Sequence, residues 1–216
     1  MRTYFALAAL ALVACSASDP TSSSSTAAVT EPAPAAKALP VCAYPEGPYG
    51  FKVGNVIPPD LKWDGVVAGG SAVTYSTNDF FDCDGSKGLN AVIFDSSAEW
   101  CGACQAEAQE LEGFIRTTWG QNGVAVITLM MEDLNHKPST DLALAKNWAS
   151  KFHLQNVPVV LDPNFDFAKG TSGTIGLPYN VLVNPRTMKV VKVPYAPGAG
   201  GHDAAIDALI AANQQQ

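Results

Sequence analysis

Short apolar runs alternate with segments of helical periodicity after Asn90. Three of these runs have the length and composition of buried strands: 91–94, 124–130 and 157–161. After the first run, apolar positions recur at steps of three and four residues, at Cys104, Ala108, Leu111, Ile115 and Trp119. This spacing predicts a helix that begins near Cys101 and turns that face inward, with Gly120 and Gly123 closing the helical region.

The remaining pattern predicts two more helices and two hairpins. Thr140 is a suitable cap for a helix with apolar positions at Leu142, Ala145, Ala149 and Phe152, and a last helix is expected from about Asp203. Apolar segments 179–183 and 188–193 flank a turn-forming stretch and predict an antiparallel hairpin. Segments 60–65 and 72–75 predict a further hairpin at the edge of the sheet.

This order of elements predicts an α/β fold. We expect a mixed central sheet with helices on both faces and an N-terminal β-hairpin extension. The length from residue 41 to 216 fits one domain, and the sequence contains no internal repeat.

The first fifteen residues have the pattern of an export signal. Arg2 precedes an uncharged run, 4–14, that is too short to span a bilayer and ends in Leu-Val-Ala-Cys. That ending resembles a bacterial lipobox, which implies that residues 1–14 are a signal peptide and that Cys15 becomes the lipidated first residue. An ordinary signal peptide with a chance cysteine is the alternative. If the host is Gram-negative, Ser16 in place of Asp implies sorting to the periplasmic face of the outer membrane.

Residues 15–40 are rich in Ser, Thr, Ala and Pro and carry few charges. Such a stretch buries too little apolar area to offset the entropy of ordering it, so we interpret it as a tether between the lipid and the domain.

Charge excludes one class of partner. The net charge is -7 and no cluster of Lys or Arg occurs after the signal, so nucleic acid is not an expected partner. The three histidines are scattered without ligand spacing, so we expect no zinc site and no metal.

The five cysteines divide by position. Cys15 is the lipidation site, Cys101 and Cys104 form a C-x-x-C motif, and Cys42 and Cys83 remain. In an oxidising compartment the last two are expected to pair in a structural disulfide, and the alternative is two free thiols.

Two motifs carry a family resemblance. Trp100-Cys101-Gly102-Ala103-Cys104 follows a strand at the start of a helix, and Gly176-Leu177-Pro178-Tyr179 precedes a later strand. Together they resemble the active site and the cis-proline loop of the thioredoxin superfamily, and the long N-terminal part is similar to TlpA-like and ResA-like exported oxidoreductases with a redoxin domain. The resemblance covers roughly residues 50–212 and implies a thioredoxin-like three-layer sandwich.

The cysteine chemistry has a physical basis. A cysteine at the first turn of a helix is favoured as a thiolate, so Cys101 is the expected nucleophile. Cys104 lies on the inward face and would resolve the mixed disulfide. The dithiol carries the electrons, so no cofactor is expected.

Three further residues are candidates. Pro178, if cis, would place its loop against the disulfide, and the alternative is a trans proline that begins a strand. Asp95, at the end of the apolar strand, is a buried general base for Cys104 or else a solvated strand end. Trp100 shields the site and contacts partners, or only packs.

Two departures from the family bear on substrate and direction. Ser96 and Ser97 stand where aromatic residues are usual, and Ala103 stands where thioredoxin has proline, which leaves the redox potential open. We favour a membrane-tethered reductase of protein disulfides that receives electrons from an upstream donor. The alternatives are a binding lipoprotein with a locked disulfide and a thiol peroxidase.

Overall fold

The computed structural model describes residues 42–169 and 174–215. The expected signal peptide, the lipidation site Cys15 and the expected tether all lie outside the described residues. No helix within the described ranges is long and apolar enough to cross a membrane.

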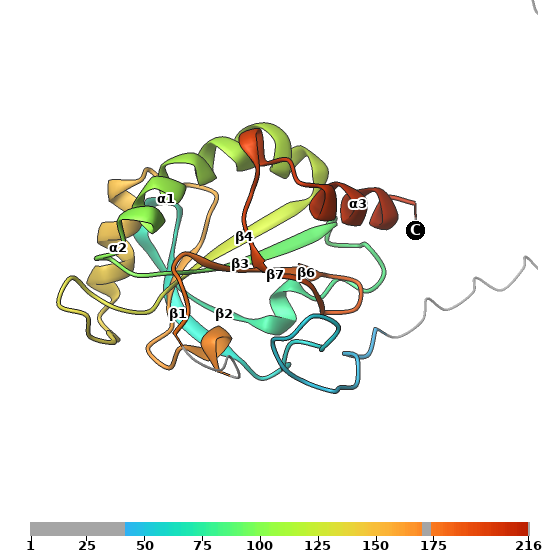
Figure 1. The fold of residues 1–216 in the computed structure, drawn as a ribbon, viewed down its shortest axis with the longest axis horizontal. Helices are drawn as coiled ribbons and strands as arrows, with labels where there is room; N and C mark the ends of the chain where they lie inside the picture. Colours follow the sequence, from blue (N-terminus) through green and yellow to red (C-terminus); the bar gives the residue numbers. More distant parts are fainter. Residues whose placement is uncertain (1–41, 170–173, 216) are drawn as a thin grey trace, which may run out of the picture. The chain divides into compact units, whose positions relative to one another are not determined.

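The centre of the fold is a mixed seven-stranded sheet (Figure 1). Its strands run in the order β2-β1-β5-β4-β3-β6-β7. β3, β4 and β5 are parallel, and the hairpins β1–β2 and β6–β7 pair antiparallel on either side of them. The strand bounds are β1 Lys62–Val67, β2 Ser71–Ser76, β3 Ala91–Ser97, β4 Val124–Met130, β5 Val159–Leu161, β6 Tyr179–Asn184 and β7 Lys189–Tyr195. The predicted mixed sheet with an N-terminal hairpin extension is therefore confirmed.

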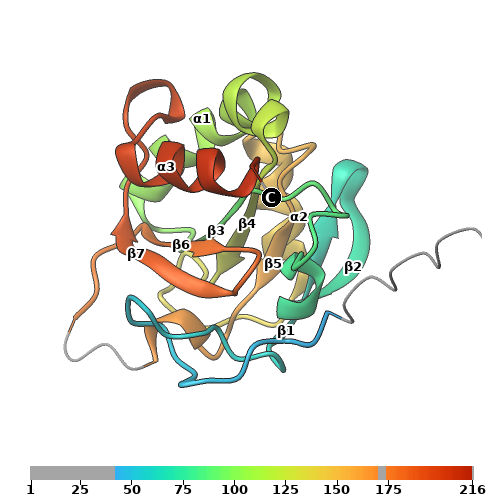
Figure 2. The ribbon, with the colours of Figure 1, turned by 90° about the vertical axis from the view of Figure 1, so that its right-hand side faces the viewer.

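Helical segments cover the two faces of the sheet unequally. α1 (Gly102–Phe114), α2 (Leu142–Lys151) and α3 (Ala204–Asn213) share one apolar core with one face. The other face is covered by the chain before β1 and by short 3-10 helices at 77–80 and 166–168 (Figure 2). The core on that side is aromatic, since the ring of Phe94 contacts the rings of Trp63, Phe80 and Phe167.

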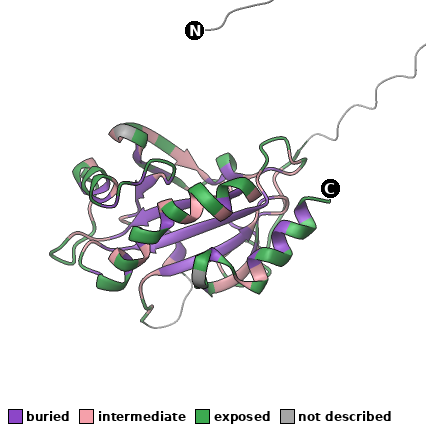
Figure 3. Ribbon diagram, turned by 90° about the horizontal axis from the view of Figure 1, so that it is seen from above, coloured by how far each residue is buried: buried purple, intermediate pink, exposed green. Residues whose placement is uncertain are grey.

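Burial follows the predicted periodicities. β3 is buried along its whole length, as expected for a central strand covered on both sides (Figure 3). α1 buries Cys104, Ala108 and Leu111, and a π-helical turn at Ile115–Trp119 extends it far enough to bury Trp119.

The start of the second helix differs from its prediction. Asp141, not Thr140, is the N-cap, and its carboxylate accepts a hydrogen bond from the amide of Ala143. Aspartate is at least as good a cap as threonine, so the choice between neighbours depends on where the chain turns. The buried face is centred on Ala145 and Trp148. The third predicted strand is also shorter than expected and begins at Val159.

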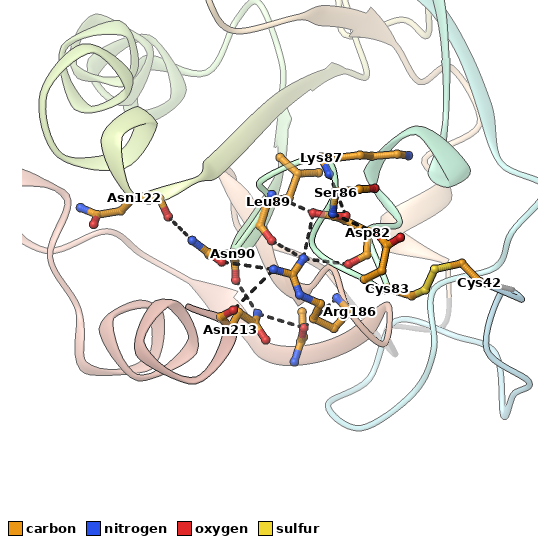
Figure 4. A network of polar contacts seen from close by, with 12 residues as sticks. Cys42, Asp82, Cys83, Ser86, Lys87, Leu89, Asn90, Asn122, Arg186 and Asn213 are labelled. Atoms are coloured by element: carbon orange, nitrogen blue, oxygen red, sulfur yellow. Dashed lines mark hydrogen bonds and ion pairs between the residues drawn. A yellow bond between two sulfur atoms is a disulfide. The ribbon is translucent and has the colours of Figure 1, made fainter. Parts of the chain in front are cut away.

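A buried ion pair joins distant segments at the end of the sheet where β3 begins (Figure 4). Arg186, in the turn after β6, donates to the Asp82 carboxylate at 2.8 Å and to the Leu89 carbonyl at 2.7 Å. Close by, Cys42 and Cys83 form a disulfide with their Cα atoms 5.8 Å apart. The N-terminal segment is thus bonded covalently to the loop before β3, at the end of that strand away from Cys101.

Candidate active site

The C-x-x-C motif lies at the head of α1. Cys101 is the N-cap residue, Cys104 lies in the first turn, and the two form a disulfide with Cα atoms 5.3 Å apart. The Cys101 sulfur also accepts a hydrogen bond of 3.1 Å from the backbone N–H of Cys104. Unpaired amides at a helix start favour negative charge, so the Cys101 sulfur is placed to be stabilised as a thiolate when the disulfide opens.

The two sulfurs differ in their access to solvent. Cys101 is 5% exposed and Cys104 is 1% exposed. Cys104 belongs to the core between α1 and the sheet, as the predicted helical face requires. A partner can therefore reach Cys101 first, and any proton on Cys104 must move through the protein.

The proline loop adjoins this core. The Leu177–Pro178 peptide bond is cis, and Leu177 packs against the apolar cluster that contains both cysteines. Tyr179 then begins β6 opposite Ser96 of β3. The loop thus lies at the end of the sheet from which the chain enters α1.

Trp100 is held by the loop after β4. Its indole N–H donates to Glu132 at 2.8 Å, and its ring stacks on His136 with centroids 4.5 Å apart. The side chain is 38% exposed. Trp100 therefore presents a fixed apolar surface beside Cys101 and also makes packing contacts.

Asp95 is buried inside β3 rather than solvated at its end, because the strand continues to Ser97. Its two carboxylate oxygens accept hydrogen bonds from Ser97 Oγ at 2.8 Å and Thr128 Oγ1 at 2.9 Å. Burial raises the pKa of Asp95 to about 6, although these two hydrogen bonds oppose the shift. Ser97 thus donates a hydrogen bond to the Asp95 carboxylate, at a position where the family resemblance implies an aromatic ring.

Glu107 is a second acid that the sequence motifs did not predict. It lies on α1 one turn beyond Cys104, and Asn180 of β6 donates to its Oε1 at 2.6 Å. Burial and the nearby charge of Asp95 raise the pKa of Glu107 to about 8. The spacing Cys104-x-x-Glu107 was a usable signal, because residues three apart on a helix are neighbours.

The possible metal ligands lie elsewhere. Among residues 42–169 and 174–215, one group of three brings its ligand atoms within 4.8 Å of each other: Cys42, Cys83 and Asp84. The two sulfurs are joined in the disulfide, which leaves one carboxylate and no set of ligands for a cation.

Comparison with known proteins identifies the fold. No protein-family model matches the chain, and no curated protein sequence matches it. A structure from Chlorobium tepidum TLS, a thiol:disulfide interchange protein of the thioredoxin family, has a TM-score of 0.51 and 18% identity over 70% of this chain and 95% of that chain. AhpC from Enterococcus faecalis has a TM-score of 0.53 and 15% identity, covering 77% and 93%.

A hypothetical protein from Sinorhizobium meliloti 1021 has a TM-score of 0.52 and 18% identity, covering 76% of this chain and 86% of that chain. Identities this low establish the fold and leave the activity open. The chain therefore has a thioredoxin-like fold, with its C-x-x-C disulfide at the head of α1.

Proposed function

We propose that this chain is a thiol-disulfide oxidoreductase that acts on protein disulfides through Cys101 and Cys104, in the reducing direction. The observation that supports this most is the disulfide at the head of α1 together with two acids of raised pKa on the elements that pack around Cys104, the buried Asp95 of β3 and the half-buried Glu107 of α1. A disulfide with only a structural role has no need for proton acceptors of raised pKa beside its buried sulfur.

The reaction follows from the positions of the two sulfurs. The Cys101 thiolate attacks a substrate disulfide, forms a mixed disulfide and releases one substrate thiolate. Cys104 then gives its proton to the acid pair, and its sulfur attacks Cys101 and displaces the second substrate thiolate. Two electrons pass from the protein dithiol to the substrate, whose thiolates take two protons. An upstream donor dithiol restores Cys101 and Cys104.

The other site residues have supporting roles. Asp95 and Glu107 accept the proton of Cys104, which is the general-base role. Pro178 has no N–H of its own and leaves its loop free to receive a substrate chain. Trp100, fixed by Glu132 and His136, offers an apolar contact to the partner.

We further propose that the protein is exported and tethered to a membrane by lipid on Cys15, with 15–40 as the tether. The lipobox-like ending of the signal supports the anchor, and the second disulfide, Cys42–Cys83, is typical of an oxidising compartment. In a Gram-negative host this is the periplasmic face of the outer membrane. Fatty-acid labelling in cells that is lost in Cys15→Ala tests the anchor.

Insulin reduction tests the activity. The full chain carrying Cys15→Ser, supplied with a small dithiol, is compared with the same chain carrying Cys101→Ser as well. We expect turbidity from reduced insulin only with the first protein. Equal rates would reject the oxidoreductase and favour a binding lipoprotein with a locked disulfide.

Trapping tests the class of substrate. Without the resolving thiol, Cys104→Ala should accumulate mixed disulfides with exported proteins, visible as bands that disappear on reduction. Cys101→Ser/Cys104→Ala is the matched control and should show no such bands. Identical band patterns for the two variants would contradict a protein substrate.

A further inference from the structure

A groove of about 820 Å³ lies beside the proline loop. It opens on the face of the sheet opposite α1, where its lining residues Phe51, Tyr179 and Val193 pack with the aromatic core. Tyr179 directly follows the cis Leu177–Pro178 bond. Sites that bind ligands have volumes of about 300–1,000 Å³, so this groove is large enough to hold several side chains of a bound polypeptide.

The outer wall of the groove exposes apolar side chains. Among the described residues, large apolar side chains are exposed at Tyr49, Val53, Trp100 and Leu134. The first two, 50% and 60% exposed, both line this groove. Neighbouring exposed apolar side chains are typical of interaction sites, so the wall is a candidate contact for a partner.

Backbone hydrogen bonds hold this wall against β7, although the wall has no regular secondary structure. The Gly54 N–H donates to the Val190 carbonyl, and the Val190 N–H donates to the Asn55 carbonyl, both at 2.9 Å. The Ile57 N–H donates to the Met188 carbonyl at the same distance. Figure 2 shows this segment, in blue, beside β7. A wall that is already ordered loses little entropy when a partner binds.

The charge of the groove is opposite to that of the chain. Lys52 and Lys169 line it, and none of its described lining residues is acidic. Lys169 pairs with Asp166 at 2.6 Å, whereas Lys52 is exposed and forms no ion pair with any described residue. In a protein of net charge -7, an unpaired cation beside an apolar groove favours a bound segment that carries a carboxylate.

The proline loop connects the groove to the redox site. Leu177 packs against two apolar clusters, one that contains Cys101 and Cys104 and one that contains Tyr179 of the groove. The loop is therefore the common border of the two sites. A polypeptide bound at Cys101 that passes over this loop reaches the groove next.

We propose that this groove binds an extended segment of the substrate protein beside its disulfide, and that the segment carries apolar side chains and an acidic residue. The proposal rests on the proposed function and names the class of substrate for the same site. Tyr49 and Val53 contact the apolar side chains, and Lys52 pairs with the carboxylate. The groove sets which disulfides reach Cys101 and leaves the exchange chemistry unchanged.

Three short peptides, each a dimer joined by a disulfide, test the proposal on the full chain with Cys15→Ser. In the first, Leu, Glu and Phe flank the cysteine on both sides; the second has Lys in place of Glu, and the third has Ser in place of Leu and Phe. We expect kcat/KM for the Glu peptide to exceed that for the Lys peptide by about five-fold, the upper range for an exposed ion pair. The net charge alone would favour the Lys peptide. The Ser peptide should be about ten-fold poorer, since it buries no apolar side chain.

Lys52→Glu should reverse the order of the Glu and Lys peptides, and Val53→Ser should slow the Glu peptide about three-fold while leaving the Ser peptide unchanged. Both positions are exposed, so neither change removes a core contact. Lys146→Glu, the same charge change on α2 at the other face of the sheet, is the matched control and should keep the wild-type order.

Two failures are distinguishable. A wild type that reduces insulin without preferring the Glu peptide would overturn the groove, as would a Lys52→Glu protein that keeps the wild-type order. A wild type that reduces neither insulin nor any peptide would instead reject the proposed function.

Discussion

At the scale of single residues, the unusual feature is the pair of acids on the strand and the helix that pack around Cys104. Asp95 and Glu107 come from a strand and a helix that the fold packs together, and burial raises the pKa of each. Two carboxyl groups in one apolar layer resist being charged at once, so the pair retains a proton near neutrality. Near neutrality one carboxylate of the pair can accept the proton of Cys104, and above about pH 8 both can.

This arrangement predicts a pH dependence for Glu107→Gln. In the wild type, the rate of insulin reduction should rise with pH through the window from about 6 to about 8, where the acid pair loses its proton. The variant keeps only Asp95, so the limb near pH 8 should disappear and the rate at pH 8 should fall by about ten-fold or more.

Glu110→Gln is the control for this experiment. Glu110 lies one turn further along α1, is exposed, and carries the same chemical change. The limb near pH 8 should remain, moved slightly toward lower pH because the charge of Glu110 also helps to raise the pKa of Glu107. If Glu107→Gln also retained the limb near pH 8, Glu107 would have no part in the proton transfer.

At the scale of elements, the strong periodicities were predictable and the long-range pairings were not. Local spacing predicts the apolar runs that form β3 and β4, and it predicts the inward face of α1. The C-x-x-C motif then places both cysteines at the head of that helix. Glu107 was missed because a lone Glu in a helix ordinarily belongs to the solvated face. Its hydrogen-bond partner Asn180 lies on β6, and strand register, which brings the two together, is a tertiary property.

The start of α2 shows the same limit over a single residue. Thr140 and Asp141 are both competent caps, but only Asp141 bonds to the free amide of Ala143. Asp141→Ala should therefore lower the free energy of unfolding by about 1 kcal/mol, the usual cost of losing a helix cap. Thr140→Ala should change it by less than about 0.5 kcal/mol, as for ordinary surface substitutions. Urea denaturation measures both, and equal losses would refute the assignment of the cap.

At the scale of the whole molecule, three acids with raised pKa values connect stability to pH. Asp162 follows β5, and burial, together with the charge of Asp166, raises its pKa to about 7. It joins Asp95 at about 6 and Glu107 at about 8. All three lie above the ordinary values near 4 that these groups have in an unfolded chain. The folded protein therefore binds more protons than the unfolded chain throughout this window.

The sign of the effect follows from that difference. Stabilisation by a group whose pKa is raised on folding is complete below its unfolded value and is lost as pH rises through its folded value. The free energy of unfolding should thus fall from about pH 4 to about pH 8, with each group contributing up to about 1.4 kcal/mol per pH unit while it is protonated only in the folded state. Urea denaturation across this range, with the disulfides intact, measures the slope. Asp162→Asn should make the decline shallower between pH 4 and 7 without altering insulin reduction, because Asp162 contacts Asp166 and neither cysteine. A free energy of unfolding that rises from pH 5 to 8 would show that these carboxyl groups are ionised in the folded protein. The raised pKa values assigned to them would then be wrong.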